Sequence, residues 1–309
     1  MRVVSLLPSA TEIVCALGAA DQLVGISHEC DFPADIADRP VVTRSRIVPG
    51  ASSGDIDRAV RLALLDALSI YAVDAELLAR LAPDVIITQD LCEVCAVSLD
   101  DVRSAVARHA HGRAEIVSLR PVRLDDVLDD VVRVAAALDR RATGEAVRAA
   151  LRHRITATAA TAAIAARAGS RSERPRVVTL EWLDPIMLGG TWMPDLVELA
   201  GGVAVGVTPG APAPTITPAE LGALAPDVVL IKPCGFTLDR TLAERALIDD
   251  RVLARVGGAT RVYASDGSAY FNRPGPRLVE SLEIMAACTH PAMFDDLARK
   301  HAAVITRLR

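Results

Sequence analysis

An internal repeat is the feature that most constrains the fold of this chain of 309 residues. The segment Leu78–Ile87, LARLAPDVII, recurs as Leu221–Leu230, LGALAPDVVL. Their Pro-Asp turns start at Pro83 and Pro226, 143 residues apart, which is close to half the chain. Each copy is typical of a helix end, a tight turn and a short buried strand. A period this long indicates a duplicated domain rather than a solenoid, so we expect two similar lobes.

Short apolar runs separated by helical patterns follow one another in both halves of the chain. They predict strands at Val3–Leu6, Val24–Ser27, Val85–Thr88, Ile116–Leu119, Val177–Leu180, Val228–Ile231 and Val262–Ala264. Runs of this kind, joined by helices, indicate parallel sheets covered on both faces. The first helix should start with a Ser-x-x-Glu capping box, formed by Ser9 and Glu12, and end at Gly18.

A proline-free segment rich in Ala and Arg lies between the two halves. From about Thr143 to Ala168, alanines and apolar residues recur at helical spacing. Roughly 26 helical residues would span about 39 Å, which is long enough to bridge two lobes. We therefore expect an N-terminal α/β lobe at 1–140, a bridging helix at 141–170 and a C-terminal α/β lobe at 171–309.

Composition and charge exclude several classes of protein. The net charge of −5 argues against nucleic-acid binding, which needs a concentrated basic face. No stretch approaches the roughly 20 apolar residues of a membrane helix, so we expect no membrane insertion. The N-terminus lacks a signal-peptide pattern, because the apolar run after Arg2 soon reaches Pro8 and Glu12. As given, the chain is predicted to be cytoplasmic, with its six cysteines as thiols or metal ligands rather than disulfides.

Several motifs together resemble one family. They are Ser5–Glu12, Val24–Pro33, the two Leu-Ala-Pro-Asp-Val copies, and Ser265–Asp266 with Arg273–Arg277. The family is the helical-backbone (class III) substrate-binding proteins of ABC transporters, in particular the cobalamin-binding members. The resemblance covers nearly the whole chain in order. It implies an α/β fold of two Rossmann-like lobes, one long bridging helix and a ligand cleft between the lobes.

The sequence departs from this family at its N-terminus. Members normally carry an export signal, and none is recognised in this sequence. Either the true start lies upstream and the protein is periplasmic or cell-surface, or this is an intracellular branch. An ABC permease is a partner in the first case.

Candidate ligand-binding residues follow the predicted strands, because ligands of open parallel sheets bind beyond the carboxyl ends of the strands. Six of the nine aromatic residues lie on these loops: Phe32, Trp182, Trp192, Phe236, Tyr270 and Phe271. Flat rings suit a large flat macrocycle, although the alternative is that they pack in the lobe interface. The resemblance implies that Phe32, Trp182, Asp266 and Arg273 lie near a corrin ring and its amides. The remaining candidates are Ser9, Ala10 and His28. The predicted function is binding of a corrinoid, such as cobalamin, or a related metallo-macrocycle.

Four cysteines fall on the same loops. Cys30 follows the second strand, and Cys92 and Cys95 form a C-x-x-C after the first Pro-Asp-Val repeat. Cys234 follows the second repeat, at nearly the same distance from its proline as Cys92. If the two lobes face each other, these thiols converge on one cleft.

The chemistry of these thiols leaves alternatives open. Four thiolates could hold a structural zinc or an iron–sulfur cluster, whereas the C-x-x-C could be redox-active. His28 could instead ligate cobalt or iron in a bound macrocycle. The remaining alternative is that these cysteines are small buried residues in tight loops and have no chemical role. An intracellular metal or iron–sulfur protein is therefore the second predicted function.

The sequence contains no recognisable catalytic motif. It lacks a Gly-rich phosphate loop, a His-Glu-x-x-His and a nucleophile elbow, so we expect no enzyme. In the substrate-binding family that this sequence resembles, an acidic residue on each lobe pairs with permease arginines. The matching positions are Glu76 and Glu220, which lie shortly before the two repeats.

Overall fold

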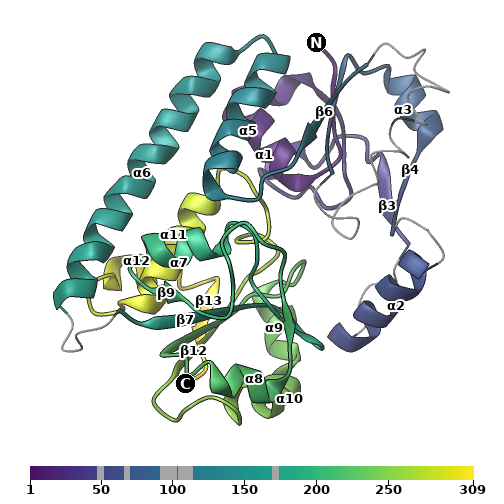
Figure 1. Ribbon diagram of the computed structural model, residues 1–309. Coiled ribbons are helices and arrows are strands. Elements are labelled where there is room, and N and C mark those ends of the chain that lie inside the picture. Colours follow the sequence, from purple (N-terminus) through teal and green to yellow (C-terminus); the bar gives the residue numbers. More distant parts are fainter. Residues whose placement is uncertain (47–51, 66–69, 91–102, 104–113, 169–173) are drawn as a thin grey trace. The chain divides into compact units, whose positions relative to one another are not determined.

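The computed structural model describes residues 1–46, 52–65, 70–90, 103, 114–168 and 174–309 (Figure 1). The described chain divides into two compact units, each of which is presented by itself. The first comprises Met1–Ala51, Asp55–Pro121 and Asp125–Ala150, and the second comprises Ser52–Gly54, Val122–Leu124 and Leu151–Arg309.

The first unit is built on a four-stranded parallel sheet with strand order β2-β1-β5-β6. Its strands are β1 (Val3–Ser5), β2 (Leu23–Ile26), β5 (Val85–Gln89) and β6 (Glu115–Leu119). The four predicted strands are confirmed within one residue at each end. All four strands end at the same edge of the sheet, where the loops that carry the candidate residues begin.

Helices cover both faces of this sheet, as the apolar strands require. On one face, Val4, Leu6 and Ile86 pack with Leu78 in a buried cluster. The other face contacts α1. The remaining elements of this part of the chain are α1 (Pro8–Ala16), η1 (Ala20–Gln22), η2 (Ala34–Ile36), β3 (Thr43–Ser45), α2 (Ser53–Leu65), β4 (Tyr71–Val73), α3 (Ala75–Leu81) and α5 (Leu124–Ala137). Strands β3 and β4 pair antiparallel outside the main sheet.

The predicted capping box at the start of α1 is wrong. The helix begins at Pro8, its N-cap is Leu7, and no side chain caps it. Because proline presets the backbone angle of a first helical residue, Pro8 starts the helix before Ser9 is reached. Ser9 therefore lies inside the first turn, 1% exposed. The end of the helix is confirmed, since Gly18 has φ +67° and donates its N–H to the Cys15 carbonyl.

The second unit has a mixed sheet. Its strand order is β10-β8-β7-β11-β12-β13, with β9 beside β7. The strands are β7 (Arg176–Leu183), β8 (Ile186–Leu188), β9 (Val203–Ala204), β10 (Thr215–Ile216), β11 (Val228–Ile231), β12 (Arg261–Ser265) and β13 (Ile305–Arg307). Strands β7, β11 and β12 are parallel, as expected, whereas β8, β10 and β13 pair antiparallel. The three predicted strands are confirmed as parallel, whereas the antiparallel strands were not predicted; β8 returns along β7 after a short turn.

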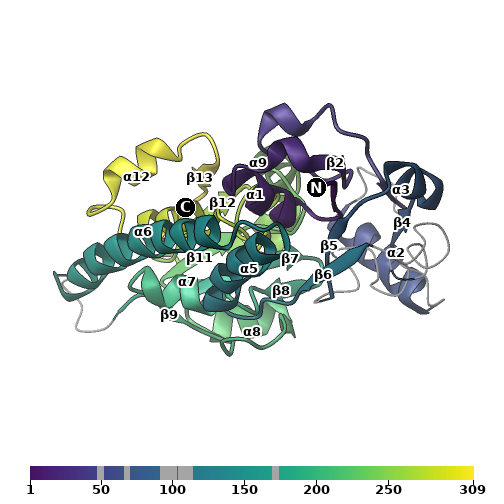
Figure 2. The same cartoon turned by 90° about the horizontal axis from the view of Figure 1, so that it is seen from above.

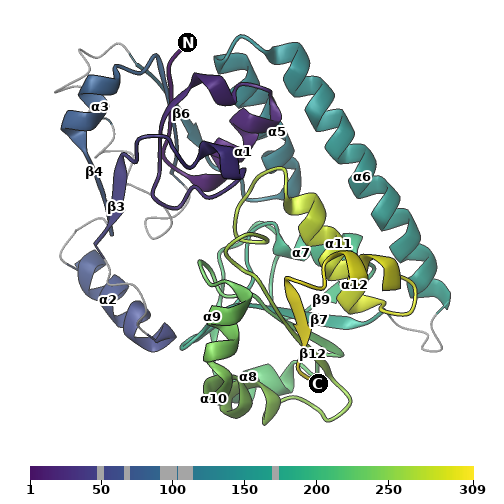
Figure 3. The same cartoon turned by 180° about the vertical axis from the view of Figure 1, so that it is seen from behind.

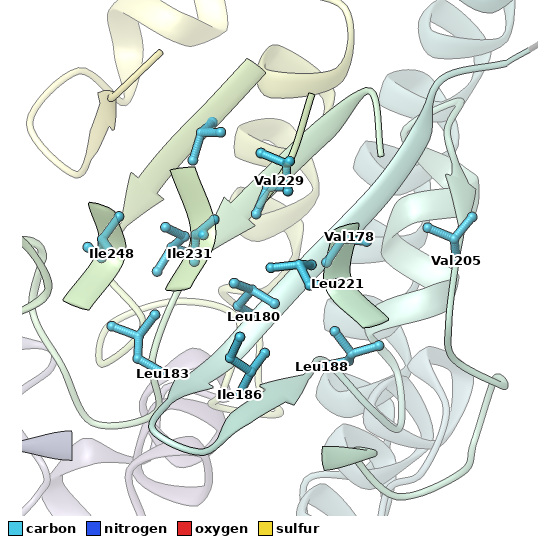
Figure 4. Close-up of a cluster of buried hydrophobic side chains, with 13 residues drawn as sticks. Val178, Leu180, Leu183, Ile186, Leu188, Val205, Leu221, Val229, Ile231 and Ile248 are labelled. Carbon is cyan, nitrogen blue, oxygen red and sulfur yellow. The ribbon is translucent and has the colours of Figure 1, made fainter. Parts of the chain in front are cut away.

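The core of the second unit lies on one face of this sheet (Figure 4). Val178, Leu180, Val229 and Ile231 point from the central strands toward Leu221 of α8. Helices α8, α10 and η3 lie on this side, and α7 and α11 cover the other (Figures 1 and 3). The helices are α7 (Met193–Leu199), α8 (Pro218–Ala223), α9 (Leu238–Ala243), α10 (Arg245–Ile248), α11 (Leu278–Thr289) and α12 (Asp295–Lys300), with the π-helical turn η3 (Asp249–Leu253).

The long helix α6 (Arg141–Ala168) has 28 residues and is seen along its full length in Figure 2. The division between the two units falls within it, after Ala150. The α/β fold class with a long helix between two sheet-containing units is therefore confirmed. The expected cleft between the lobes stays a prediction.

The sequence repeat has the same backbone conformation in both units. Ala82 and Ala225 both adopt left-handed angles, with φ 41° and 44°, immediately before the Pro-Asp turn. Such angles cost a residue with a Cβ roughly 1–2 kcal/mol. Because both copies share this strained backbone conformation, we conclude that the repeat is one structural unit used twice.

Hydrogen bonds extend the repeat to the first strand of each unit. Asp84 accepts the backbone N–H of Arg2 (2.7 Å), and Asp227 accepts that of Arg176 (2.9 Å). The two guanidinium groups donate to carbonyls at the preceding helix end, Arg2 to Leu81 and Arg176 to Leu224. Each arginine precedes a Val-Val pair. The Arg-Val-Val starts are thus equivalent, a correspondence that sequence analysis missed.

Candidate ligand-binding site

A chain of small polar groups follows β1 in the first unit. The Thr11 hydroxyl donates to Ser5 Oγ (2.8 Å), and Cys30 Sγ lies 3.1 Å from Thr11 Oγ1. Because the single hydroxyl proton of Thr11 is given to Ser5, the Cys30 thiol is the donor in its contact with Thr11. Cys30 is 9% exposed. The thiol is therefore hydrogen-bonded inside this unit.

His28 follows β2 and is held by Thr43. Its backbone N–H lies 3.0 Å from Thr43 Oγ1, and its ring Nδ1 lies 2.7 Å from the same oxygen. Thr43 in turn donates to Ser27 Oγ (2.9 Å). His28 is exposed, while Thr43 and Ser27 are buried. A buried pair of hydroxyls thus fixes an imidazole at the carboxyl edge of the sheet.

Tyr71 forms a second support for His28. The two rings are tilted by 53°, with centroids 5.2 Å apart. The Tyr71 hydroxyl donates to Glu29 Oε1 (2.8 Å). Partial burial lowers the pKa of His28 below its usual value, against the raising effect of Glu29. The ring is therefore neutral at neutral pH.

The other candidates of the first unit differ in exposure. Phe32, on the loop after β2, is 46% exposed, which is unusual for an aromatic residue in this chain. Ser9 and Ala10 are buried in the first turn of α1, and no described group is hydrogen-bonded to Ser9 Oγ. His28 and Phe32 are thus the candidates that this unit presents to solvent.

A fully buried lysine joins the loops at the carboxyl edge of the second unit. Lys232, directly after β11, is 0% exposed and donates to Asn272 Oδ1 (2.8 Å). Its Nζ lies 3.5 Å from Glu181 Oε2. Burial lowers the pKa of Lys232, and the Glu181 carboxylate opposes this. Asn272 also donates to the carbonyls of Lys232 and Gly267. This cluster, which sequence reasoning missed, links the loops after β11 and β12.

Gly267 is required by the close approach of these loops. A Cβ at this position would lie 2.2 Å from the Pro233 carbonyl oxygen and 2.5 Å from that of Lys232. We expect Gly267→Ala to lower the free energy of unfolding by roughly 1–3 kcal/mol, as for other overpacked sites. Gly258→Ala is the matched control, since nothing lies within 4 Å of its Cβ position, and it should change stability by less than about 0.5 kcal/mol. Urea unfolding of both variants measures the difference; equal midpoints would contradict the packing argument.

The predicted aromatic residues of the second unit pack mainly inside it. Phe271 is completely buried, and its carbonyl accepts the Trp192 Nε1–H (2.8 Å). Trp182 and Phe236 form a tilted pair with centroids 5.2 Å apart, at 8% and 5% exposure. Arg240 lies over Phe236, 4.3 Å from the ring centroid. Phe236 and Phe271 lie on loops at the edge of the sheet. The prediction of Trp182 as a loop residue is wrong, because β7 continues three residues beyond the predicted strand end at Leu180 and includes it. A role of these rings in ligand binding stays a prediction.

The first turn of α2 belongs to the second unit and covers Trp182. Trp182 Nε1–H lies 3.2 Å from both the Ser53 and the Asp184 carbonyl oxygens. The Ser53 hydroxyl donates to Glu244 (2.8 Å), which also pairs with Arg240 (2.8 Å). Ser53 and Glu244 have no sequence signature, because the contact joins positions 191 residues apart.

The remaining candidates of the second unit differ in exposure: Asp266 and Tyr270 are partly exposed, and Arg273 is buried. Tyr270 lies under the Arg277 guanidinium, 5.4 Å from the ring centroid. Asp266 accepts the Ala269 N–H (2.7 Å), and Arg273 reaches Ser268 Oγ at 3.4 Å. The structure thus places Asp266, Tyr270 and Arg273 on one loop after β12, where the sequence predicted them.

The metal site expected from the cysteines remains a prediction. Cys92 and Cys95 lie outside the described residues. Cys30 belongs to the first unit, and Cys234 is exposed on the second. Among the residues that the structure describes, no group of three or more His, Cys, Asp or Glu side chains is arranged to hold a metal ion.

The two candidate docking residues are exposed. Glu76 lies in the first turn of α3. Glu220 lies in the first turn of α8 and forms a capping box with Thr217, whose hydrogen bonds lower the pKa of Glu220. The two glutamates occupy corresponding helices of the repeat. Docking to a permease through them stays a prediction.

Comparison with known proteins decides the family. The family model described as "Periplasmic binding protein" matches residues 3–261. The chain belongs to this periplasmic binding protein family. Members are substrate-binding proteins rather than enzymes, which agrees with the missing catalytic motifs. No curated protein matched the chain in the sequence search.

Solved structures of periplasmic binding proteins share the fold along nearly the whole chain. A periplasmic heme-binding protein from Pseudomonas aeruginosa is 20% identical with a TM-score of 0.69, covering 94% of this chain and 93% of its own. The heme-binding protein RhuT from Roseiflexus sp. RS-1 is 22% identical with a TM-score of 0.65, covering 96% and 98%. The vitamin B12 binding protein BtuF of Vibrio cholerae is 19% identical with a TM-score of 0.63, covering 96% and 98%. At these identities the likeness shows the fold alone.

The structure adds one observation on membranes. None of the helices in the described part of the chain is both long enough and apolar enough to cross a bilayer.

Proposed function

We propose that this periplasmic binding protein binds a metal-centred tetrapyrrole of the corrinoid or haem class. The observation that carries the proposal is the exposed ring of Phe32 on a loop at the carboxyl edge of the parallel sheet. Ligands of open parallel sheets bind at this edge, and an aromatic face offers a flat macrocycle broad apolar contact. The exposed imidazole of His28 lies on the same loop.

Three further facts support this ligand class. Proteins of the same fold, named above, bind heme or vitamin B12. The exposed imidazole suits a ligand that contains iron or cobalt, because imidazole is a common ligand of both metals. The loop after β12 carries two polar side chains for the substituents of a macrocycle, the partly exposed Asp266 and the buried Arg273. Delivery to an ABC permease, docked through Glu76 and Glu220, is the transport role that this binding would serve.

Thermal unfolding tests the proposal. A ligand at about 100 times its Kd stabilises the folded state by about 2.7 kcal/mol. We expect either aquacobalamin or haemin to raise the melting temperature, and a ferric siderophore to leave it unchanged. Stabilisation by the siderophore, or by none of the three, would contradict the proposed ligand class.

A matched pair of variants ties the binding to the sheet edge. Phe32→Ala should weaken binding of the active tetrapyrrole about fivefold, since a ring contact contributes on the order of 1 kcal/mol. Ile164→Ala removes a side chain of α6 that is 61% exposed and should bind as the wild type does. Equal loss in both variants would show that Phe32 has no specific role.

A further inference from the structure

The hydrogen bonds around Thr43 determine which nitrogen of His28 carries the proton. A threonine hydroxyl has one proton to donate and two lone pairs to accept with. Thr43 donates its proton to Ser27 Oγ (2.9 Å). Its lone pairs therefore accept from the backbone N–H of His28 (3.0 Å) and from ring Nδ1 (2.7 Å), so that Nδ1 carries the hydrogen.

The opposite nitrogen of the ring is left with a lone pair. In a neutral imidazole with hydrogen on Nδ1, Nε2 is the unprotonated atom. No described residue is hydrogen-bonded to His28 Nε2, and the residue is exposed. Tyr71 packs at 5.2 Å from the ring and restricts its rotation. The Tyr71 hydroxyl is itself held by Glu29 (2.8 Å), which fixes this neighbour in place.

From this arrangement we infer that His28 Nε2 is an axial ligand to the central metal of the bound tetrapyrrole, with Thr43 as its positioning residue. The inference rests on the proposed function and narrows it to macrocycles with an axial position open to nitrogen. Nε2 donates its lone pair to iron or cobalt, and the water that held that position leaves. Metal-bound histidines commonly donate their other ring N–H to a fixed oxygen, and loss of such a partner typically costs about 10–100-fold in metal affinity. Thr43 Oγ1 is that oxygen here.

Electron paramagnetic resonance of a bound corrinoid tests the coordination directly. The probe is aquacobinamide, a corrinoid without a base of its own, reduced to Co(II) after binding. Its unpaired electron lies along the axial direction, so an axial nitrogen-14 splits the cobalt lines into triplets. We expect triplets with the wild-type protein and doublets when its histidines carry nitrogen-15. His28→Ala should lose the splitting, and the His153→Ala control, on the exposed side of α6, should keep it.

Two variants separate positioning from folding. Thr43→Val keeps the shape but removes the acceptor, and should weaken binding of the probe about 10–100-fold. Thr43→Ser restores the hydroxyl and should recover the wild-type affinity and splitting. Equal affinities of Thr43→Val and wild type would overturn the role of Thr43.

The outcomes distinguish this inference from the function on which it rests. Equilibrium dialysis reports whether the probe is bound, independently of its spectrum. A bound probe without nitrogen splitting, or with splitting that persists in His28→Ala, overturns the inference and leaves tetrapyrrole binding standing. If cobinamide, aquacobalamin and haemin are all not retained, the proposed function fails and the inference with it. The nitrogen-15 comparison uses the unaltered chain, so it does not depend on any variant folding.

Discussion

Replacing Glu283 of α11 with glutamine should lower the free energy of unfolding at pH 7 by roughly 2–4 kcal/mol. Glu283 is 9% exposed and accepts hydrogen bonds from Lys300 (2.6 Å), His301 (2.8 Å) and Arg154 (2.9 Å). These contacts tie α6, α11 and the end of α12 together within the second unit. Removing the charge leaves three donors around a neutral amide, and breaking a buried ion pair costs about 3–5 kcal/mol.

The acid dependence of stability should change with this substitution. Burial raises the pKa of Glu283, but the hydrogen bonds from His301, Lys300 and Arg154 outweigh it and lower the pKa from 4.5 to about 2. A carboxyl with a lowered folded-state pKa stabilises the protein above about pH 4.5, and this contribution is lost as the pH falls to about 2. At about 1.4 kcal/mol for each unit between the two pKa values, it amounts to roughly 3 kcal/mol.

Urea unfolding of wild type and Glu283→Gln at pH 7 and pH 3 measures both effects. The matched control is Glu280→Gln, since Glu280 also pairs with Arg154 (2.8 Å) but is 24% exposed. The control should lose less than about 1 kcal/mol. A loss in Glu283→Gln no larger than in the control would contradict the assigned role of the buried carboxylate.

Replacing Asp130 with asparagine should have the opposite effect to Glu283→Gln. It should raise the free energy of unfolding at pH 8 by roughly 2–4 kcal/mol. Asp130 of α5 is 2% exposed, and no described group is hydrogen-bonded to its Oδ2. Burial raises the pKa of Asp130 from 3.8 to about 7, although Arg133, at 3.3 Å from Oδ1, opposes the shift. Ionising this carboxyl in the folded state is therefore costly, and an asparagine carries no charge to bury.

The pH dependence of the Asp130 effect follows from its raised pKa. The folded state holds a proton that the unfolded state has released above about pH 4, so stability falls as the pH rises from about 4 to about 7. The gain from Asp130→Asn should thus be large at pH 8 and small at pH 4. Asp129→Asn is the control on the same helix, because Asp129 is 59% exposed. A gain that does not depend on pH would show that the charge of Asp130 is not its cause.

The fold was largely predictable because the chain repeats itself. The Leu-Ala-Pro-Asp-Val motif identified two equivalent strands, and the buried β-branched runs identified their parallel neighbours. These signals are local, so they are visible in the sequence. The long helix α6 was predictable for the same reason, since a proline-free run of alanines leaves few alternatives.

The errors have two causes, strand pairing that the sequence pattern does not show and a competing local signal. Strands β10 and β13 have two and three residues, too short for a periodic pattern, and their antiparallel pairing depends on partners far away in sequence. The capping box at Ser9 failed because Pro8 starts the helix earlier. The pattern Ser-x-x-Glu was present, but a stronger local constraint determined the boundary.

The candidate site shows the same division between local and distant signals. The position of His28 and Phe32 at the carboxyl edge of the sheet could be predicted because both follow a strand directly. Thr43 and Tyr71, which hold the imidazole, are separated from it in sequence and have no motif of their own. Of the aromatic residues predicted on loops of the second unit, Trp182 lies within β7, and Trp192, Phe236 and Phe271 are buried. Sequence does not say exactly where a strand ends or which face of a loop a ring occupies. Lys232 was overlooked because a buried lysine is rare.

Equilibrium dialysis tests the central claim, tetrapyrrole binding, most directly. The purified chain is dialysed separately against aquacobalamin, haemin and a ferric siderophore, and the bound fraction is measured at increasing ligand concentration. The account predicts saturable retention of at least one tetrapyrrole, weakened in Phe32→Ala, with no retention of the siderophore. Retention of the siderophore alone, or of none of the three, would contradict it.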